Sequence, residues 1–123
     1  MNLDWGNFCA LALSEVEATL AALPEPLHER AKQLPVTFER RPSVDLQADG
    51  IEVDTLGLFT GAELAEEGEI PLPPQIILFI ENLGKFAEGD ENVFGEEVRT
   101  TFLHELGHYL GLGEDELAER GLE

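Results

Sequence analysis

The sequence predicts a single α+β domain over residues 1–123: an N-terminal helix, a small sheet of three or four strands, a long helix and a short last helix. Two segments near the ends repeat apolar residues at the spacing of a helix. Short apolar runs bounded by Pro and Gly, typical of strands, lie between them. The length of 123 residues, 43% of them hydrophobic, is enough for one modest core.

The first helix is expected from about Asp4 to Leu23, where Pro24 stops it. Its apolar positions mostly keep a spacing of three or four; they are Phe8, Leu11, Leu13, Val16 and Leu20. A short second helix is expected over 26–34, between Pro26 in its first turn and Pro35 beyond its end.

Three runs read as strands: 36–39, 55–60 and 75–80. The third is the richest in β-branched residues. Its continuous apolar character predicts a strand covered on both faces, in a mostly antiparallel or mixed sheet. The polar segments 40–54, 63–69 and 82–90 are expected to be loops.

The long helix is expected to begin with a cap at Asn92 or Gly95 and to run to about Leu110. A helical wheel places Val98, Leu106, Tyr109 and Leu110 on the side of Phe102. The same wheel places His104 and His108 on the opposite side, together with Glu97 and Thr101. A last short helix is expected over 115–120.

The stretch from His104 to Glu114 carries the chemistry. His104 and His108 are four residues apart, so their Cβ atoms lie about 5–6 Å apart on one helix face. Two imidazoles at this spacing can each place a nitrogen about 2.0–2.1 Å from one Zn²⁺. Glu105 is rotated by about 100° from His104, too far to be an equal third ligand. Its carboxylate can instead act as a general base on a water at the metal.

A third ligand is expected just after the helix. Gly111 is where a left-handed residue commonly ends a helix, and Gly113 helps the chain reverse. That reversal could bring Glu114 to the metal, with Asp115 and Glu116 as alternatives. The competing interpretation of the whole stretch is a solvated helix face that carries two histidines by chance.

Two other reactive side chains are expected to be structural. His28 has no partner motif, which favours a surface or capping histidine. Cys9 lies among apolar residues of the first helix, which favours a buried thiol. One cysteine excludes an internal disulfide and fits a reducing compartment.

The charge of the chain limits its partners. Seven Lys and Arg against 26 Asp and Glu give a formal net charge of −19. Such a field repels nucleic acid and anionic membranes, and it favours solubility first and attraction of cations or basic peptides second. The first residues carry no basic segment and no run approaches the roughly 18 apolar residues of a membrane span. We therefore expect a cytoplasmic protein that binds neither nucleic acid nor membrane.

The full pattern H-E-x-x-H-x-x-G-x-x-[DE] resembles the zincin metallopeptidases, and among them the small bacterial and archaeal minigluzincins. Segments 34–39, 56–61 and 73–79 extend the resemblance over most of the chain, with weaker signatures. The resemblance implies a minimal zincin-like domain in which His104, His108 and Glu114 hold the zinc and Glu105 is the general base. Glu114 stands where metzincins have a third His, and the only Met is Met1, so a metzincin is excluded.

The expected function is zinc-dependent hydrolysis of peptide bonds. The resemblance further implies a peptide or protein substrate that lies extended along an exposed edge strand. Two alternatives stay open: a zinc-binding module without significant hydrolytic activity that acts through a protein partner, and a metal-free interaction domain. The sequence leaves the edge strand, the preferred side chains and the oligomeric state undetermined.

Overall fold

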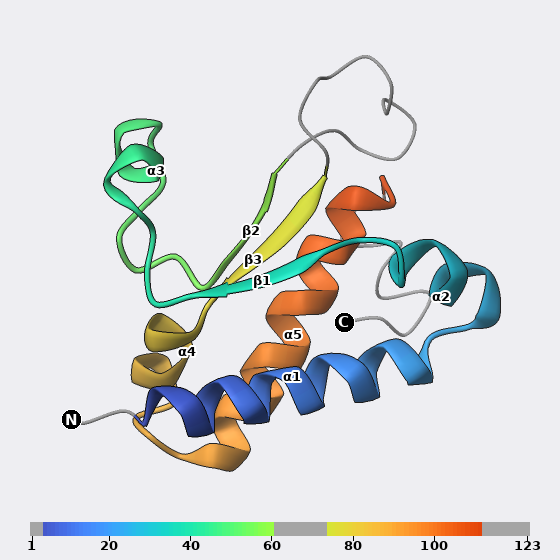
Figure 1. Ribbon diagram of the computed structural model, residues 1–123, viewed down its shortest axis with the longest axis horizontal. Coiled ribbons are helices and arrows are strands. Elements are labelled where there is room, and N and C mark those ends of the chain that lie inside the picture. The colour runs from blue at the N-terminus through green and yellow to red at the C-terminus, as the bar shows by residue number, and fades with distance from the viewer. Residues whose placement is uncertain (1–3, 61–73, 112–123) are drawn as a thin grey trace.

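The computed structural model describes residues 4–60 and 74–111, which form five helices and three strands (Figure 1). The helices are α1 (Trp5–Ala22), α2 (Glu25–Ala31), α3 (Val44–Ala48), α4 (Ile80–Phe86) and α5 (Glu91–Tyr109). The strands are β1 (Val36–Glu39), β2 (Gly57–Thr60) and β3 (Gln75–Phe79). The α+β class, both long helices and all three strands are as the sequence predicts.

The sheet is mixed, with the order β1-β3-β2. β1 runs parallel to β3, with Val36 opposite Ile76, and β2 runs antiparallel to it, with Leu58 opposite Ile77. Within the described residues β3 is therefore the central strand and β2 is an edge. Ile76 and Leu78 on one face of β3, and Ile77 and Phe79 on the other, are all buried. This confirms the expectation of a strand covered on both faces.

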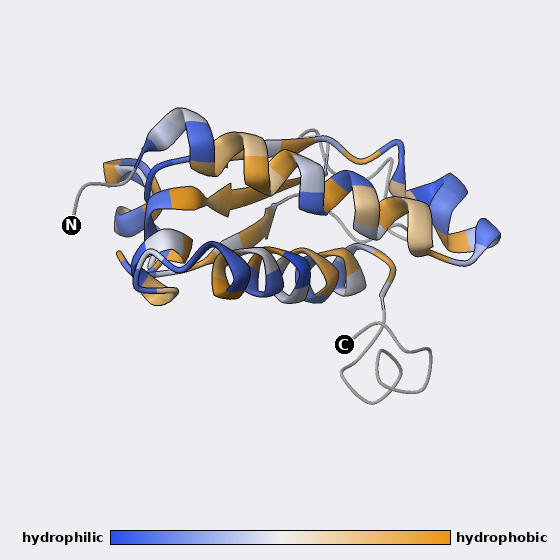
Figure 2. Ribbon diagram, turned by 90° about the horizontal axis from the view of Figure 1, so that it is seen from below, coloured by the Kyte–Doolittle hydropathy of each residue, from blue (hydrophilic) through white to orange (hydrophobic). Residues whose placement is uncertain are grey.

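The core lies between the long helices and the sheet. Helices α1 and α5 pack against each other, and α5 also packs against β2 and β3. In Figure 2 the strands, mostly hydrophobic, are visible between the two long helices. The rings of Phe8 in α1 and Phe94 in α5 meet edge to face, with their centroids 4.6 Å apart. One face of α5 supplies the centre of this core: Phe94, Val98, Phe102 and Leu106.

The start of α5 differs from the sequence-based expectation. Asp90 is the N-cap, and its Oδ1 accepts the backbone N–H groups of Asn92, at 2.9 Å, and Val93, at 3.1 Å. The carboxylate satisfies two of the donors that the first turn leaves unpaired. The helix therefore begins at Glu91, and Asn92 and Gly95 lie within it.

Two segments expected to be loops contain short helices. In 40–54, Ser43 caps α3 by accepting the N–H of Leu46, but no residue of α3 is buried, and Figure 1 shows α3 standing away from the sheet. The first residues of 82–90 belong to α4, which follows directly from β3. The burial of Ile80 and Leu83 stabilises this helix. Neither helix is longer than seven residues, so periodicity gives little signal for them.

The expected loop at 63–69 and the last helix at 115–120 lie outside the described residues. Cys9, which was expected to be buried, is only half-buried, and this partial burial raises the pKa of its thiol. In the part of the chain that the structure describes, no helix is long and apolar enough to cross a membrane.

The contact between α1 and α5 predicts the effect of truncating Phe94. Phe94→Ala should lower the free energy of unfolding by about 3–5 kcal/mol, because it removes a fully buried ring and leaves a cavity against Phe8. Val93→Ala, at a side chain that is 38% exposed, should cost less than about 1 kcal/mol. Urea unfolding followed by circular dichroism measures both. Equal losses in the two variants would contradict this packing.

Candidate metal centre

The last two turns of α5 bring His104 and His108 together. Their Nε2 atoms are 3.3 Å apart, and their rings meet at 87° with centroids separated by 4.8 Å. His104 is half-buried and His108 is exposed. The i, i+4 spacing therefore places two imidazole nitrogens side by side at a surface that solvent and ions can reach.

The distance between these nitrogens fits a shared metal ion. Two ligands of a tetrahedral zinc at about 2.0–2.1 Å lie about 3.3–3.4 Å from each other. The observed separation of 3.3 Å matches this value. His104, Glu105 and His108 each offer a ligand atom, and these atoms lie within 4.8 Å of one another. Borderline-soft nitrogen donors with a carboxylate beside them are the chemistry that zinc prefers.

Glu105 is held in place by the sheet. Its Oε1 accepts the backbone N–H of Phe59 in β2 at 3.0 Å. Burial raises the pKa of Glu105 above its ordinary value, while the imidazoles of His108 and His104 and the N–H of Phe59 oppose that rise. Glu105 is therefore a positioned carboxylate with an increased tendency to hold a proton.

The hydrogen-bond pattern of β2 defines which backbone groups face the free edge of the sheet. The N–H of Phe79 donates to the carbonyl of Leu56 at 3.0 Å, so Leu56 points its backbone toward β3. Because alternate residues of a strand point to opposite sides, Gly57 and Phe59 point away from β3, as the bond from Phe59 to Glu105 requires. The free edge of β2 therefore lies beside the histidine pair.

Strand β2 approaches α5 closely at Gly57. A methyl group added to Gly57 would lie 2.5 Å from Cγ2 of Thr101 and 3.5 Å from Cγ of Glu105. Any larger residue would require the strand or the side chain of Thr101 to shift. This contact also buries Thr101, which the helical wheel placed on the solvated side with the histidines. The wheel is wrong there because β2 covers that part of α5.

A hollow of about 310 Å³ lies beside the cluster, between the start of β2 and α5. Its lining residues are Leu56, Gly57, Glu97, Thr100, Thr101, His104 and Glu105. It is large enough for one side chain, because small-molecule pockets begin at about 300 Å³. A molecule bound at the candidate metal centre could therefore place one of its side chains in this hollow.

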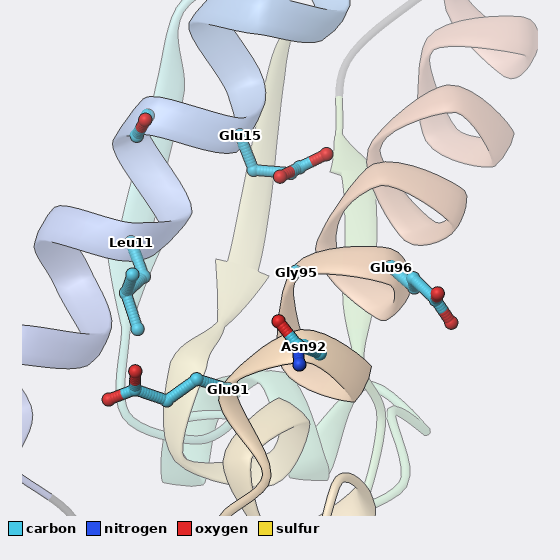
Figure 3. Close-up of a pocket in the computed structure, with 7 residues that line it drawn as sticks. Leu11, Glu15, Glu91, Asn92, Gly95 and Glu96 are labelled. Carbon is cyan, nitrogen blue, oxygen red and sulfur yellow. The ribbon is translucent and has the colours of Figure 1, made fainter.

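A larger hollow, of about 620 Å³, lies between α1 and the start of α5 (Figure 3). Its lining residues are Leu11, Ser14, Glu15, Glu91, Asn92, Gly95 and Glu96. Figure 3 shows Glu15 of α1 pointing across toward α5. None of the three clustered residues lines it, so it is separate from the candidate metal centre.

The third ligand expected from the sequence is not described. Helix α5 ends as predicted: Gly111 has φ +73°, and its N–H donates to the carbonyl of His108. Glu114 and its alternatives Asp115 and Glu116 lie outside the described residues.

The remaining histidine is structural, as expected. Nδ1 of His28 is 2.7 Å from the carbonyl of Leu20, where it links α2 to the last turn of α1. Gly57 and Phe59 were not predicted from the sequence to be parts of the site. A Gly inside a predicted strand is a known sign of close backbone approach, and that signal was present at Gly57.

Comparison with known protein families gives a match. A family model described as zincin-like metallopeptidase matches residues 31–122, three quarters of the chain, including β1 to β3 and all of α5. No curated protein sequence matches the chain.

The close approach at Gly57 predicts a specific steric effect. Gly57→Ala should lower the free energy of unfolding by about 1–3 kcal/mol, because the new methyl group overpacks the contact with Cγ2 of Thr101. Thr101→Ser removes that Cγ2, so adding it to Gly57→Ala should recover most of the loss. Urea unfolding of the two single variants and the double variant measures the coupling. Losses that simply add would contradict the contact.

Proposed function

The chain belongs to the zincin-like metallopeptidase family, and we propose that it hydrolyses peptide bonds with a bound zinc ion. The observation that carries this proposal is the pair of imidazole nitrogens 3.3 Å apart, with Glu105 held beside them by the sheet. The family match alone supports a metallopeptidase, and the His-Glu-His cluster adds the local chemistry. The pattern through Glu114 further favours a minigluzincin-type member.

His104 and His108 would hold the zinc, with Glu114 as the proposed third ligand. When bound, zinc acts as a Lewis acid that polarises a carbonyl and lowers the pKa of a water to about 7. Each histidine must present a neutral nitrogen for this role. The separation of their Nε2 atoms supports a shared ion without rearrangement of the helix.

Glu105 would serve as the general base. Its Oε1 is occupied by the N–H of Phe59, and within the described residues its second oxygen accepts no hydrogen bond. That oxygen would take a proton from the attacking water and pass it to the leaving amine.

The free edge of β2 would bind the substrate. In the described part of the chain β2 pairs only with β3, so the backbone N–H and carbonyl of Gly57 and the carbonyl of Phe59 face outward. An extended peptide could pair with these groups as an added strand. The bond from Phe59 to Glu105 then fixes the general base relative to that peptide.

The same reasoning extends to partners and compartment. A net charge of −19 disfavours nucleic acid and anionic membranes as partners, and we expect peptide or protein substrates only. The single cysteine fits a reducing compartment, so we propose the cytoplasm.

The zinc site is tested by removing its ligands one at a time. The wild type should retain one zinc ion per chain after dialysis, and His104→Ala or His108→Ala should abolish that retention. His28→Ala is the matched control, because it removes the third histidine, whose Nδ1 lies beside the carbonyl of Leu20 and which is not part of the cluster. Elemental analysis measures zinc per chain. Full occupancy in a His104→Ala, His108→Ala double variant would exclude this site.

The role of Glu105 separates an enzyme from a zinc-binding module. Glu105→Gln should leave zinc content nearly unchanged and lower peptide cleavage by about 10²–10⁴-fold, the usual contribution of general-base catalysis. Mass spectrometry of an unstructured peptide library measures cleavage, and elemental analysis measures zinc. If the zinc-loaded wild type cleaves no peptide, or no faster than Glu105→Gln, the zinc-binding module becomes the better description.

A further inference from the structure

We propose that the 310 Å³ hollow beside the cluster accepts a Lys or Arg side chain of the substrate, next to the scissile bond, and that Glu97 determines this preference. The proposal rests on the proposed peptidase function, because it names the substrate class of the same site. Glu97, the residue to which it gives a role, takes no part in holding the metal or in the reaction itself.

The helix places Glu97 at a fixed distance from the reacting centre. Glu97, Thr101 and His104 follow one another at intervals of four and three residues, so they share one face of α5. A rise of about 1.5 Å per residue puts Glu97 roughly 10 Å from His104 along the helix axis. The hollow connects the two, since both residues line it. A substrate side chain that begins near His104 must therefore be long to reach Glu97.

The walls of the hollow suit a long side chain with a cationic end. Leu56 and Gly57 offer apolar surface for an alkyl stem. Lys and Arg side chains carry such a stem and place their charge at the far end. The volume, about 310 Å³, fits one side chain of this kind but not a large ligand.

Apart from His104, the ionisable side chains that line the hollow in the described part of the chain are acidic. Two of its lining residues carry carboxyl groups, Glu97 and Glu105, and no Lys or Arg of the described residues lines it. Glu105 already binds the N–H of Phe59. Glu97 is half-buried, and within the described residues it makes no hydrogen bond or ion pair. An ammonium or guanidinium group would give it a charge-assisted hydrogen bond, whereas an acidic side chain would be repelled.

The overall charge of the protein offers a competing explanation for any preference for basic substrates, since −19 attracts cations in general. Glu96 separates the two explanations. It is adjacent to Glu97 on α5 but lines the larger hollow of Figure 3 instead. Glu96→Gln and Glu97→Gln change the net charge by the same amount, and only Glu97→Gln changes the hollow beside the cluster.

The test uses phosphinic peptides, in which a phosphinate replaces the scissile amide so that the reacting centre is fixed and the probe is not cleaved. Each flanking residue in turn is Lys or norleucine, which matches the stem of Lys without its ammonium group. Calorimetric titration of the zinc-loaded protein should show roughly fivefold to tenfold tighter binding of the Lys probe at one flanking position. Glu97→Gln should reduce this ratio to within about twofold, and Glu96→Gln should leave it unchanged.

Equal binding of the Lys and norleucine probes by the wild type would overturn the proposal. So would an equal loss of preference in Glu96→Gln and Glu97→Gln, because the effect would then belong to the net charge. Glu97→Lys gives an independent measurement, since it should reverse the preference toward a Glu probe. Selective binding without cleavage of any peptide would support the proposed pocket for a Lys or Arg side chain and contradict the peptidase function. Cleavage without a Glu97-dependent preference for Lys or Arg would contradict only the proposed role of the hollow.

Discussion

The contact between β2 and α5 is the constraint on which the site depends. At Gly57 the strand approaches the helix so closely that a methyl group would meet Thr101. Two residues further along, the N–H of Phe59 reaches Oε1 of Glu105. A shift of the strand by even one residue would turn this N–H toward β3, because backbone groups alternate along a strand. The orientation of Glu105 therefore follows from the register of β2.

That register is itself fixed by the core. β3 is central and buried on both faces, so its pairing with β2 cannot slip without moving apolar side chains into solvent. On the other side of the contact, Phe94 and Phe102 anchor α5 against the core. The imidazoles lie on the part of α5 that the core leaves free. Burial of one helix face thus determines where the other face presents His104 and His108.

This dependence explains what the sequence could predict. His104, Glu105 and His108 lie on one helix, so their spacing alone brings them together, and α1, β3 and α5 have strong periodic or β-branched patterns. Phe59 donates to a side chain 46 residues away, and sheet order decides that contact. The spacing of residues along the sequence therefore cannot predict the hydrogen bond between Phe59 and Glu105. The helices α3 and α4 were not predicted because they are short. Helix α4 is stabilised by packing, and α3 is identified only by its N-cap.

The carboxylate of Glu97 in the hollow and the net charge of the protein attract cations over different distances. At physiological ionic strength, fields between exposed charges are screened over about 8 Å, so a charge of −19 spread over the surface attracts any cation without orienting it. Such attraction can raise the rate of encounter but cannot select which peptide bond reaches the cluster. Selection requires one carboxylate, partly shielded from water, at a fixed distance from the reacting centre. On α5, Glu97 meets that condition, since the helix that carries His104 also carries it, two turns away and in the same hollow.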